Sequence, residues 1–168
     1  MKNNVSLQKF ILLSFATIFF ASCLHTPFSK KERNPKDIIK LSLLCRKNSK
    51  NNWIRPLKSF KYDKTFYISR FPLITTTNIA YIRLIPAKEY GKSYLELHFD
   101  THGRYLWTQV SAEYRRRLLL LTLDKQPYGK IEVKKFSEGG LLLIKIPFEN
   151  EIAKRISENA KLNYEEAH

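Results

Sequence analysis

The stretch LELHFDTHGRYLW, residues 95–107, contains the change of periodicity that decides the fold. In its first half apolar and polar residues alternate, which is the pattern of a half-buried strand. The core-facing positions of this strand are Leu95, Leu97 and Phe99. Asp100 or Thr101 then fits the N-cap of a helix. The apolar stripe of that helix consists of Leu106, Val110 and Tyr114, flanked by Trp107.

Further strands and a second helix surround this joint. Alternating or apolar runs lie at residues 64–72, 78–88, 117–124, 130–136 and 141–147. Tight turns are expected at 125–129 and 137–140, where Pro, Gly and Ser are concentrated. An amphipathic helix closes the chain at 148–162. This order predicts an α+β fold, with a mostly antiparallel sheet of about five strands and two helices packed on one face.

The composition indicates one folded domain with a strongly basic balance. The chain has 168 residues, a formal net charge of +15 and 43% hydrophobic residues, which suffice for a buried core. Such a charge suits nucleic acid or an anionic membrane surface. The Lys and Arg residues are dispersed, however, and no zinc-ligand pairs, basic heptads or ribonucleoprotein motif are present in the sequence. We therefore expect no nucleic-acid partner.

The N-terminus has the pattern of an export signal. Lys2 and Lys9 lie before an apolar run of twelve residues, FILLSFATIFFA, which is followed by Ser22 and Cys23. This run is shorter than the roughly twenty residues that a membrane-spanning helix needs. The end FASC, residues 20–23, resembles the bacterial lipobox, which implies that Cys23 is acylated, with palmitate among its chains, and becomes the mature N-terminus. An ordinary signal peptide cut after Cys23 and an uncleaved anchor are the alternatives.

A lipidated Cys23 would make the membrane a partner of this protein. Cys45 is the only other cysteine in the sequence, so no disulfide framework is expected, and a Cys23–Cys45 bridge stays open if Cys23 is not lipidated. Leu24 is not the Asp that signals inner-membrane retention in many Gram-negative lipoproteins. The lipobox resemblance therefore implies a lipid-anchored protein of the cell envelope that faces the periplasm, at the outer membrane.

We predict three segments along the chain. They are a signal peptide of the lipoprotein type at 1–22, a basic tether at 23–61 and an α+β domain at 62–168. Within the tether, NPKDIIKLSLLCRK at 34–47 predicts a short helix, with Asn34 as N-cap and Pro35 in its first turn. The surrounding Lys and Arg residues are typical of a solvated tether, with attraction to anionic headgroups as a secondary role.

Four pieces of the body share a recognisable pattern of turns and apolar residues. They are TTTNIAYIRL, LELHFDTHGRYLWTQVSAEYRRR, LLLLTLDKQPYGKIEV and GGLLLIKIPFENEIAKRI, which cover about residues 75–162. Together they resemble the head part of the first periplasmic domain of the SecD protein-export subunit. Lys125 stands where that family has Gly, and the later proline of the family's hairpin is missing. The resemblance implies a stand-alone relative that contacts exported chains or partner proteins, without catalytic residues, cofactor or the motor role of the SecD membrane segments.

The candidate metal or catalytic residues are His98, Asp100 and His102. Alternation places His98 and Asp100 on the same strand face, and their nitrogen and oxygen atoms suit zinc or iron. A metal site needs three or four convergent ligands, however, and His102 lies beyond the strand end on the first helical turn. In the competing interpretation Asp100 or Thr101 caps the helix and both histidines are partly exposed. We expect the cap, and no metal.

A second candidate site is a basic patch for an anion or a partner protein. It consists of Arg104, Arg115, Arg116 and Arg117. Cations at the C-terminus of a helix also complement its dipole, which is a sufficient structural role. A candidate aromatic surface consists of Tyr105, Trp107, Tyr114 and Tyr128, although Trp107 and Tyr114 are expected in the core.

The sequence contains no GxSxG, P-loop or HExxH motif. We therefore predict a non-catalytic, lipid-anchored envelope protein that binds or scaffolds another envelope component, with a link to protein export implied by the resemblance. One alternative is a small cell-envelope hydrolase or metal-dependent enzyme centred on His98 and Asp100. Another is a cationic protein that acts on anionic lipid or polymer.

Overall fold

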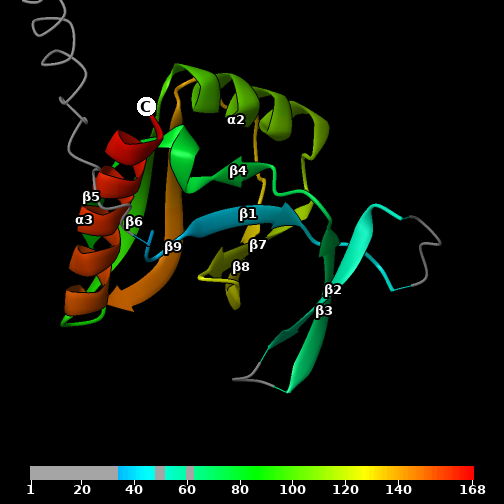
Figure 1. Cartoon of the computed structure of the whole chain (residues 1–168), viewed down its shortest axis with the longest axis horizontal. Helices are drawn as coiled ribbons and strands as arrows, with labels where there is room; N and C mark the ends of the chain where they lie inside the picture. Colours follow the sequence, from blue (N-terminus) through cyan, green and yellow to red (C-terminus); the bar gives the residue numbers. More distant parts are fainter. Residues whose placement is uncertain (1–33, 48–51, 60–62) are drawn as a thin grey trace, which may run out of the picture. The chain divides into compact units, whose positions relative to one another are not determined.

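The computed structural model describes residues 34–47, 52–59 and 63–168 (Figure 1). Pro35–His168 form one compact unit. The predicted signal peptide, the lipobox and Cys23 lie outside the described residues.

Two helices, a 3-10 turn and nine strands make up this unit in the part of the chain that the structure describes. In chain order they are β1 (Ile39–Leu43), β2 (Ile54–Ser59), β3 (Lys64–Ser69), β4 (Ile74–Thr75), η2 (Thr76–Asn78), β5 (Ile79–Pro86), β6 (Lys92–Phe99), α2 (Thr101–Glu113), β7 (Leu118–Leu123), β8 (Gln126–Glu132), β9 (Leu141–Glu149) and α3 (Asn150–Ala167). Every strand pairing is antiparallel. The predicted α+β fold with antiparallel strands and two helices is confirmed.

The strands are divided among three sheets rather than joined in one. A four-stranded sheet has the order β4-β1-β7-β8, a three-stranded sheet has the order β5-β6-β9, and β2 pairs with β3 in a hairpin. Helix α3 packs along β5 and also contacts β6 and β9, whereas α2 contacts β4, η2 and β6 (Figure 1). Both larger sheets contribute to one core, which includes Leu41 of β1, Leu97 of β6, Leu121 of β7 and Ile144 of β9.

The predicted short helix within residues 34–47 is wrong, because this segment forms strand β1. Apolar and polar residues alternate there, and Ile39 and Leu41 are buried at 1% and 0% exposure. Strand β1 lies between β4 and β7, and these two neighbours supply the hydrogen bonds that decide the conformation. The capping pattern at Asn34 and Pro35 is a local preference that this tertiary pairing overrides. The segment that we predicted as tether thus contributes β1 and β2.

The joint between β6 and α2 has the predicted cap. The Asp100 carboxylate accepts a hydrogen bond from the Gly103 N–H at 2.6 Å, and Asp100 is the N-cap residue. A β-carbon at Gly103 would collide with the Asn78 carbonyl oxygen, so only glycine permits this close approach. The buried residues of the helix are Gly103, Trp107, Val110 and Ser111. The buried face of α2 is therefore rotated about the helix axis relative to the predicted apolar stripe, since Leu106 and Tyr114 are only partly buried.

The predicted turn at 125–129 is also wrong. The turn consists of Asp124 and Lys125, which both have positive φ, at 47° and 68°. Two consecutive left-handed residues match the right-handed twist of the flanking strands. Strand β8 consequently begins at Gln126, and its pairing with β7 includes Gln126 and Pro127.

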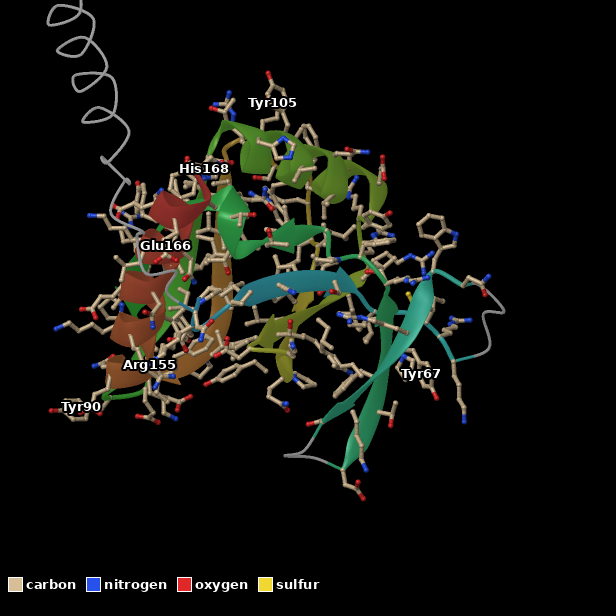
Figure 2. All side chains as sticks on the ribbon, in the orientation of Figure 1. Tyr67, Tyr90, Tyr105, Arg155, Glu166 and His168 are labelled. Carbon is tan, nitrogen blue, oxygen red and sulfur yellow. The ribbon has the colours of Figure 1, made fainter. Side chains whose placement is uncertain are left out.

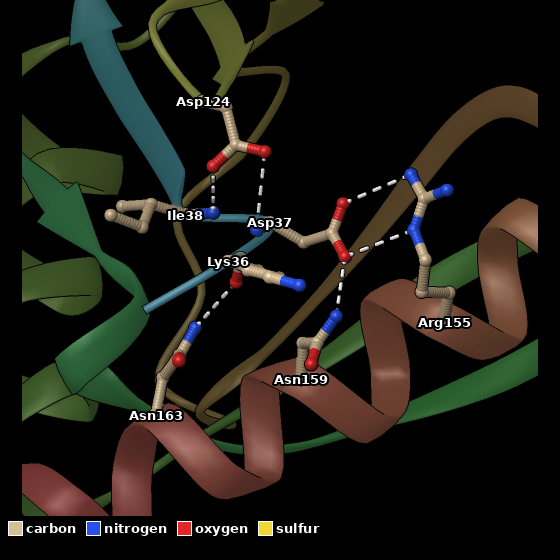
Figure 3. A network of polar contacts seen from close by, with 7 residues as sticks. All are labelled: Lys36, Asp37, Ile38, Asp124, Arg155, Asn159 and Asn163. Carbon is tan, nitrogen blue, oxygen red and sulfur yellow. Dashed lines mark hydrogen bonds and ion pairs between the residues drawn. The ribbon is translucent and has the colours of Figure 1, made fainter. Parts of the chain in front are cut away.

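A polar network fastens the first residues of the compact unit to α3 and to this turn (Figure 3). Arg155 donates from Nε and an NH2 group to the two Asp37 carboxylate oxygens, both at 3.1 Å. Asn159 Nδ2 donates to the same carboxylate at 2.6 Å. The main-chain N–H groups of Asp37 and Ile38 in turn donate to the Asp124 carboxylate at 3.2 and 2.9 Å. Residues far apart in sequence therefore hold β1 in place.

Candidate functional site

The three candidate metal or catalytic residues have separate surroundings. His98 Nε2 lies 2.6 Å from Glu96 Oε1, and its ring stacks on Tyr81 at a centroid distance of 4.1 Å. Asp100 is engaged as the helix cap, and His102 is exposed on the first turn of α2. Among the described residues no group of three or more His, Cys, Asp and Glu side chains is arranged to hold a metal ion. His98, Asp100 and His102 therefore do not converge on one point, and Asp100 has His168 Nε2 at 3.6 Å as a further neighbour.

Glu96 is the centre of a charged cluster on the face of β6 that carries His98. Arg83 lies 2.7 Å from Glu96 Oε1 across the β5–β6 pair. The hydrogen bond from Arg83, and a lesser one from His98, hold the pKa of the Glu96 carboxyl below its usual range. The same pair raises the pKa of the Arg83 guanidinium. This arrangement is an ion pair that joins two strands.

The four arginines of the predicted patch are spread along α2 and the residues that follow it. The side chain of Arg104 lies over Gly140, near the first turn of the helix. Arg115, Arg116 and Arg117 follow the helix end, about 16 Å further along at 1.5 Å per residue. Arg116 has a positive φ of 63°, and its N–H donates to the Val133 carbonyl at 2.7 Å. The four charges do not converge on one point. The patch therefore stays a prediction.

The candidate aromatic surface is not assembled. Tyr105 is 68% exposed and points away from α2 (Figure 2), whereas Trp107 is 4% exposed. Tyr128 stacks on the buried Phe148 ring at a centroid distance of 4.4 Å. Tyr105 is thus exposed, whereas Tyr114 and Tyr128 are partly buried against the core.

The structure instead presents a groove between β8 and β9, which we call the β8–β9 groove. It is open to solvent and has a volume of about 390 Å³. Its lining consists of Trp107, Ser137, residues 130–135, residues 141–143, Lys145 and Ile146. A β-carbon on Gly129 of β8 would collide with the Ile146 side chain of β9, so glycine lets the two strands touch at this position. From this contact the groove extends along residues 130–135 on one side and residues 141–143 on the other.

Both walls of the groove are sheet edges. Strand β8 is the last strand of the four-stranded sheet, and β9 is the last strand of the three-stranded sheet. The Val133 N–H and C=O bond to the β7 side, at Arg117 and Arg116, so alternation directs the main-chain groups of Glu132 away from β7. The Gly140 carbonyl accepts from the Phe99 N–H, so the main-chain groups of Leu141 and Leu143 face away from β6.

One buried polar group in the groove lining, the indole N–H of Trp107, lacks a hydrogen-bond partner within the described ranges. Trp107 Nε1 is inaccessible to solvent and has no hydrogen-bond acceptor among the described residues. The Trp107 ring is 4% exposed and belongs to the groove lining. An indole N–H without an acceptor is costly, at about 1–3 kcal/mol, and usually finds a partner.

The charge of the groove is strongly positive. Four lysines and one carboxylate belong to its lining: Lys130, Lys134, Lys135, Lys145 and Glu132. Within the described ranges none of these lysines forms an ion pair. The groove therefore offers cations that are free to meet an anionic partner.

Sequence reasoning missed this groove. The lysines of KIEVKKF are visible in the sequence, but their spacing does not reveal that two strand edges face one another. Those edges come from different sheets, and the predicted single sheet would have paired or separated them.

Searches for relatives returned structures but no sequence matches. No protein-family model matches this chain, and no curated protein does. A solved structure of a membrane component SecDF that enhances protein export is 14% identical, with a TM-score of 0.52 over 76% of this chain and 63% of that chain. SecDF in a super-membrane-facing form is also 14% identical, with a TM-score of 0.53 over 76% of this chain and 19% of that chain. This chain thus spans less than two thirds of either.

At such identity the likeness shows the fold alone, and it confirms the predicted SecD-like fold. In the part of the chain that the structure describes, neither helix is both long and apolar enough to cross a bilayer.

Proposed function

We propose that this protein is a non-catalytic, lipid-anchored component of the cell envelope that binds a segment of another envelope protein in the β8–β9 groove. The observation that carries this proposal is a cavity lined by two strand edges, those of β8 and β9, which no other strand among the described residues covers. Extended chains bind by adding to such edges, because main-chain hydrogen bonds supply affinity and the neighbouring pockets supply specificity.

The likeness to SecDF supports a binding role connected with protein export. The SecDF structure is described as a component that enhances protein export. A domain of this fold that binds extended chains fits such a role. The proposal assigns no catalysis, because Asp100, the carboxylate of the enzyme alternative, is engaged as a helix cap.

The lipid anchor belongs to the proposal through the lipobox pattern at Cys23. Two or three acyl chains, each contributing about 0.8 kcal/mol per buried CH₂, would hold the body at a bilayer. We expect metabolic palmitate labelling of the full chain and its recovery in the outer-membrane fraction. A Cys23→Ser variant is the control and should lose both. Labelling that persists in this variant would oppose the anchor.

The binding site is tested by photocrosslinking in cells. A photoreactive residue at Lys134 in the groove should form adducts with another polypeptide, whereas one at Lys154 on α3 should not. Lys134 and Lys154 are both exposed lysines, so reagent access is matched. Equal adducts at both positions, or none at Lys134, would refute the groove as the site of binding.

A further inference from the structure

We propose that the occupant of the β8–β9 groove is an extended, acidic peptide segment that pairs with the free edge of β9. This inference rests on the function proposed above and specifies the chemistry of the partner. Two independent features lead to it: the direction of the main-chain groups and the charges of the walls.

The first feature is the edge of β9. Leu141 and Leu143 direct their N–H and C=O groups away from β6, and no strand among the described residues pairs with that side. Exposed edges of this kind are templates for pairing with another chain. The length from 141 to 145 corresponds to about 15 Å at 3.3 Å per residue, enough for four or five residues of a bound strand.

The second feature is the charge of the groove walls. Lys134 and Lys145 belong to opposite walls of the groove. With Lys130 and Lys135 they outnumber Glu132, the one carboxylate that the described residues place in the lining. A strand with acidic side chains would place carboxylates between these ammonium groups. A second copy of this chain fits less well, because each copy has a net charge of +15 and like charges oppose association.

The affinity test uses the full chain and a fluorescein-labelled peptide of about ten residues in which Glu alternates with Val. Fluorescence anisotropy should detect binding of this peptide and no binding of the same peptide with Lys in place of Glu. A single-stranded oligonucleotide of equal charge is the competitor, and it should displace the peptide poorly. Displacement at equal charge concentration would overturn the inference in favour of simple polyanion binding.

Charge specificity is tested by a matched pair of double variants. Lys134→Gln with Lys145→Gln should weaken binding about three- to tenfold, the range for two partly exposed ion pairs. Lys154→Gln with Lys161→Gln on α3 changes the net charge equally and should weaken binding less than twofold. An equal effect of both pairs would show that the groove lysines have no special role.

Strand pairing is tested at Leu143, a residue of the groove lining whose N–H faces away from β6. Leu143→Pro removes that donor at an edge position that tolerates proline, and it should weaken binding about fivefold relative to Leu143→Ala. Hydrogen exchange of the wild-type chain is the second measurement, because it needs no variant. The peptide should slow exchange of the Leu141 and Leu143 amides, and unchanged exchange would refute pairing with β9.

These experiments separate the two proposals. If groove crosslinks form in cells but the acidic peptide does not bind, the acidic specificity is wrong and the groove remains a binding site. If neither occurs, both proposals are wrong.

Discussion

The network around Asp37 should contribute a measurable part of the stability, and Arg155→Ala is the perturbation that isolates it. The Asp37 side chain is 4% exposed and the Arg155 side chain is 59% exposed. Arg155 supplies two of the three side-chain hydrogen bonds that the structure gives to this carboxylate. Its removal leaves a buried carboxylate with Asn159 as its remaining side-chain donor among the described residues.

The loss of unfolding free energy expected for Arg155→Ala lies between two limits. An exposed ion pair contributes about 0.2–1 kcal/mol, whereas removal of one partner of a fully buried pair costs about 3–5 kcal/mol. Because one partner here is buried and the other exposed, we expect a loss of about 2 kcal/mol. Arg155→Lys keeps the charge but not the two-pronged geometry, so it should lose about half as much.

The assay is urea unfolding of the full chain, with Trp fluorescence as the signal and an unchanged m-value as the condition for comparison. Asp37→Asn completes a double-mutant cycle. Asn tolerates the positive φ of 53° at this position and removes the charge. Once Asp37 is neutral, Arg155→Ala should lose less than about 1 kcal/mol. A loss below about 0.5 kcal/mol in the single variant, or strict additivity in the cycle, would refute the reasoning.

Three further predictions concern the fold. Leu41→Ala should destabilise the full chain by about 2–5 kcal/mol in urea unfolding, because Leu41 is 0% exposed in β1; a change near zero would mean that this segment is a loose tether. Gly129→Val should lose about 1–3 kcal/mol by collision with Ile146, and Ile146→Ala should restore part of the loss in the double variant. The lowered pKa of Glu96 means that its ionised form stabilises the fold above its unfolded pKa, and this is lost as pH falls through the folded value. Glu96→Gln should therefore flatten the acid limb of stability, measured by urea unfolding between about pH 2 and 6.

The local patterns of the sequence predict most of the body of this fold. The alternation of Leu95 and Leu97 correctly places both side chains in the core, and Asp100 caps α2 as its position suggests. Both features depend on residues within a few positions of one another, where the side-chain period and the cap geometry are fixed by the backbone. They therefore transfer directly from sequence to structure.

The wrong predictions concern segments whose conformation depends on residues that are distant in the sequence. Residues 34–47 combine a helix-capping pattern at Asn34 and Pro35 with strand-like alternation at 39–43, and pairing with β4 and β7 makes the latter segment a strand. The turn at Asp124 and Lys125 lacks the glycine that normally indicates a left-handed pair, and the carboxylate of Asp124 is instead held by the N–H groups of Asp37 and Ile38. The groove was missed for the same reason, since it exists only where two separate sheets approach each other.

The separation of the two sheets also explains why the lysines lie where they do. Free strand edges invite pairing with identical molecules, and natural proteins protect them with charged side chains, especially Lys. Lys130, Lys134 and Lys145 flank the edges of β8 and β9 and would meet the same charges on a second copy of this chain. The same side chains attract an acidic strand, so one set of charges both prevents self-association and selects the partner. We therefore expect the Lys134→Gln, Lys145→Gln variant to bind the acidic peptide more weakly and also to self-associate more readily than wild type, as measured by sedimentation velocity. Weaker binding without increased self-association would show that the lysines act on the partner alone.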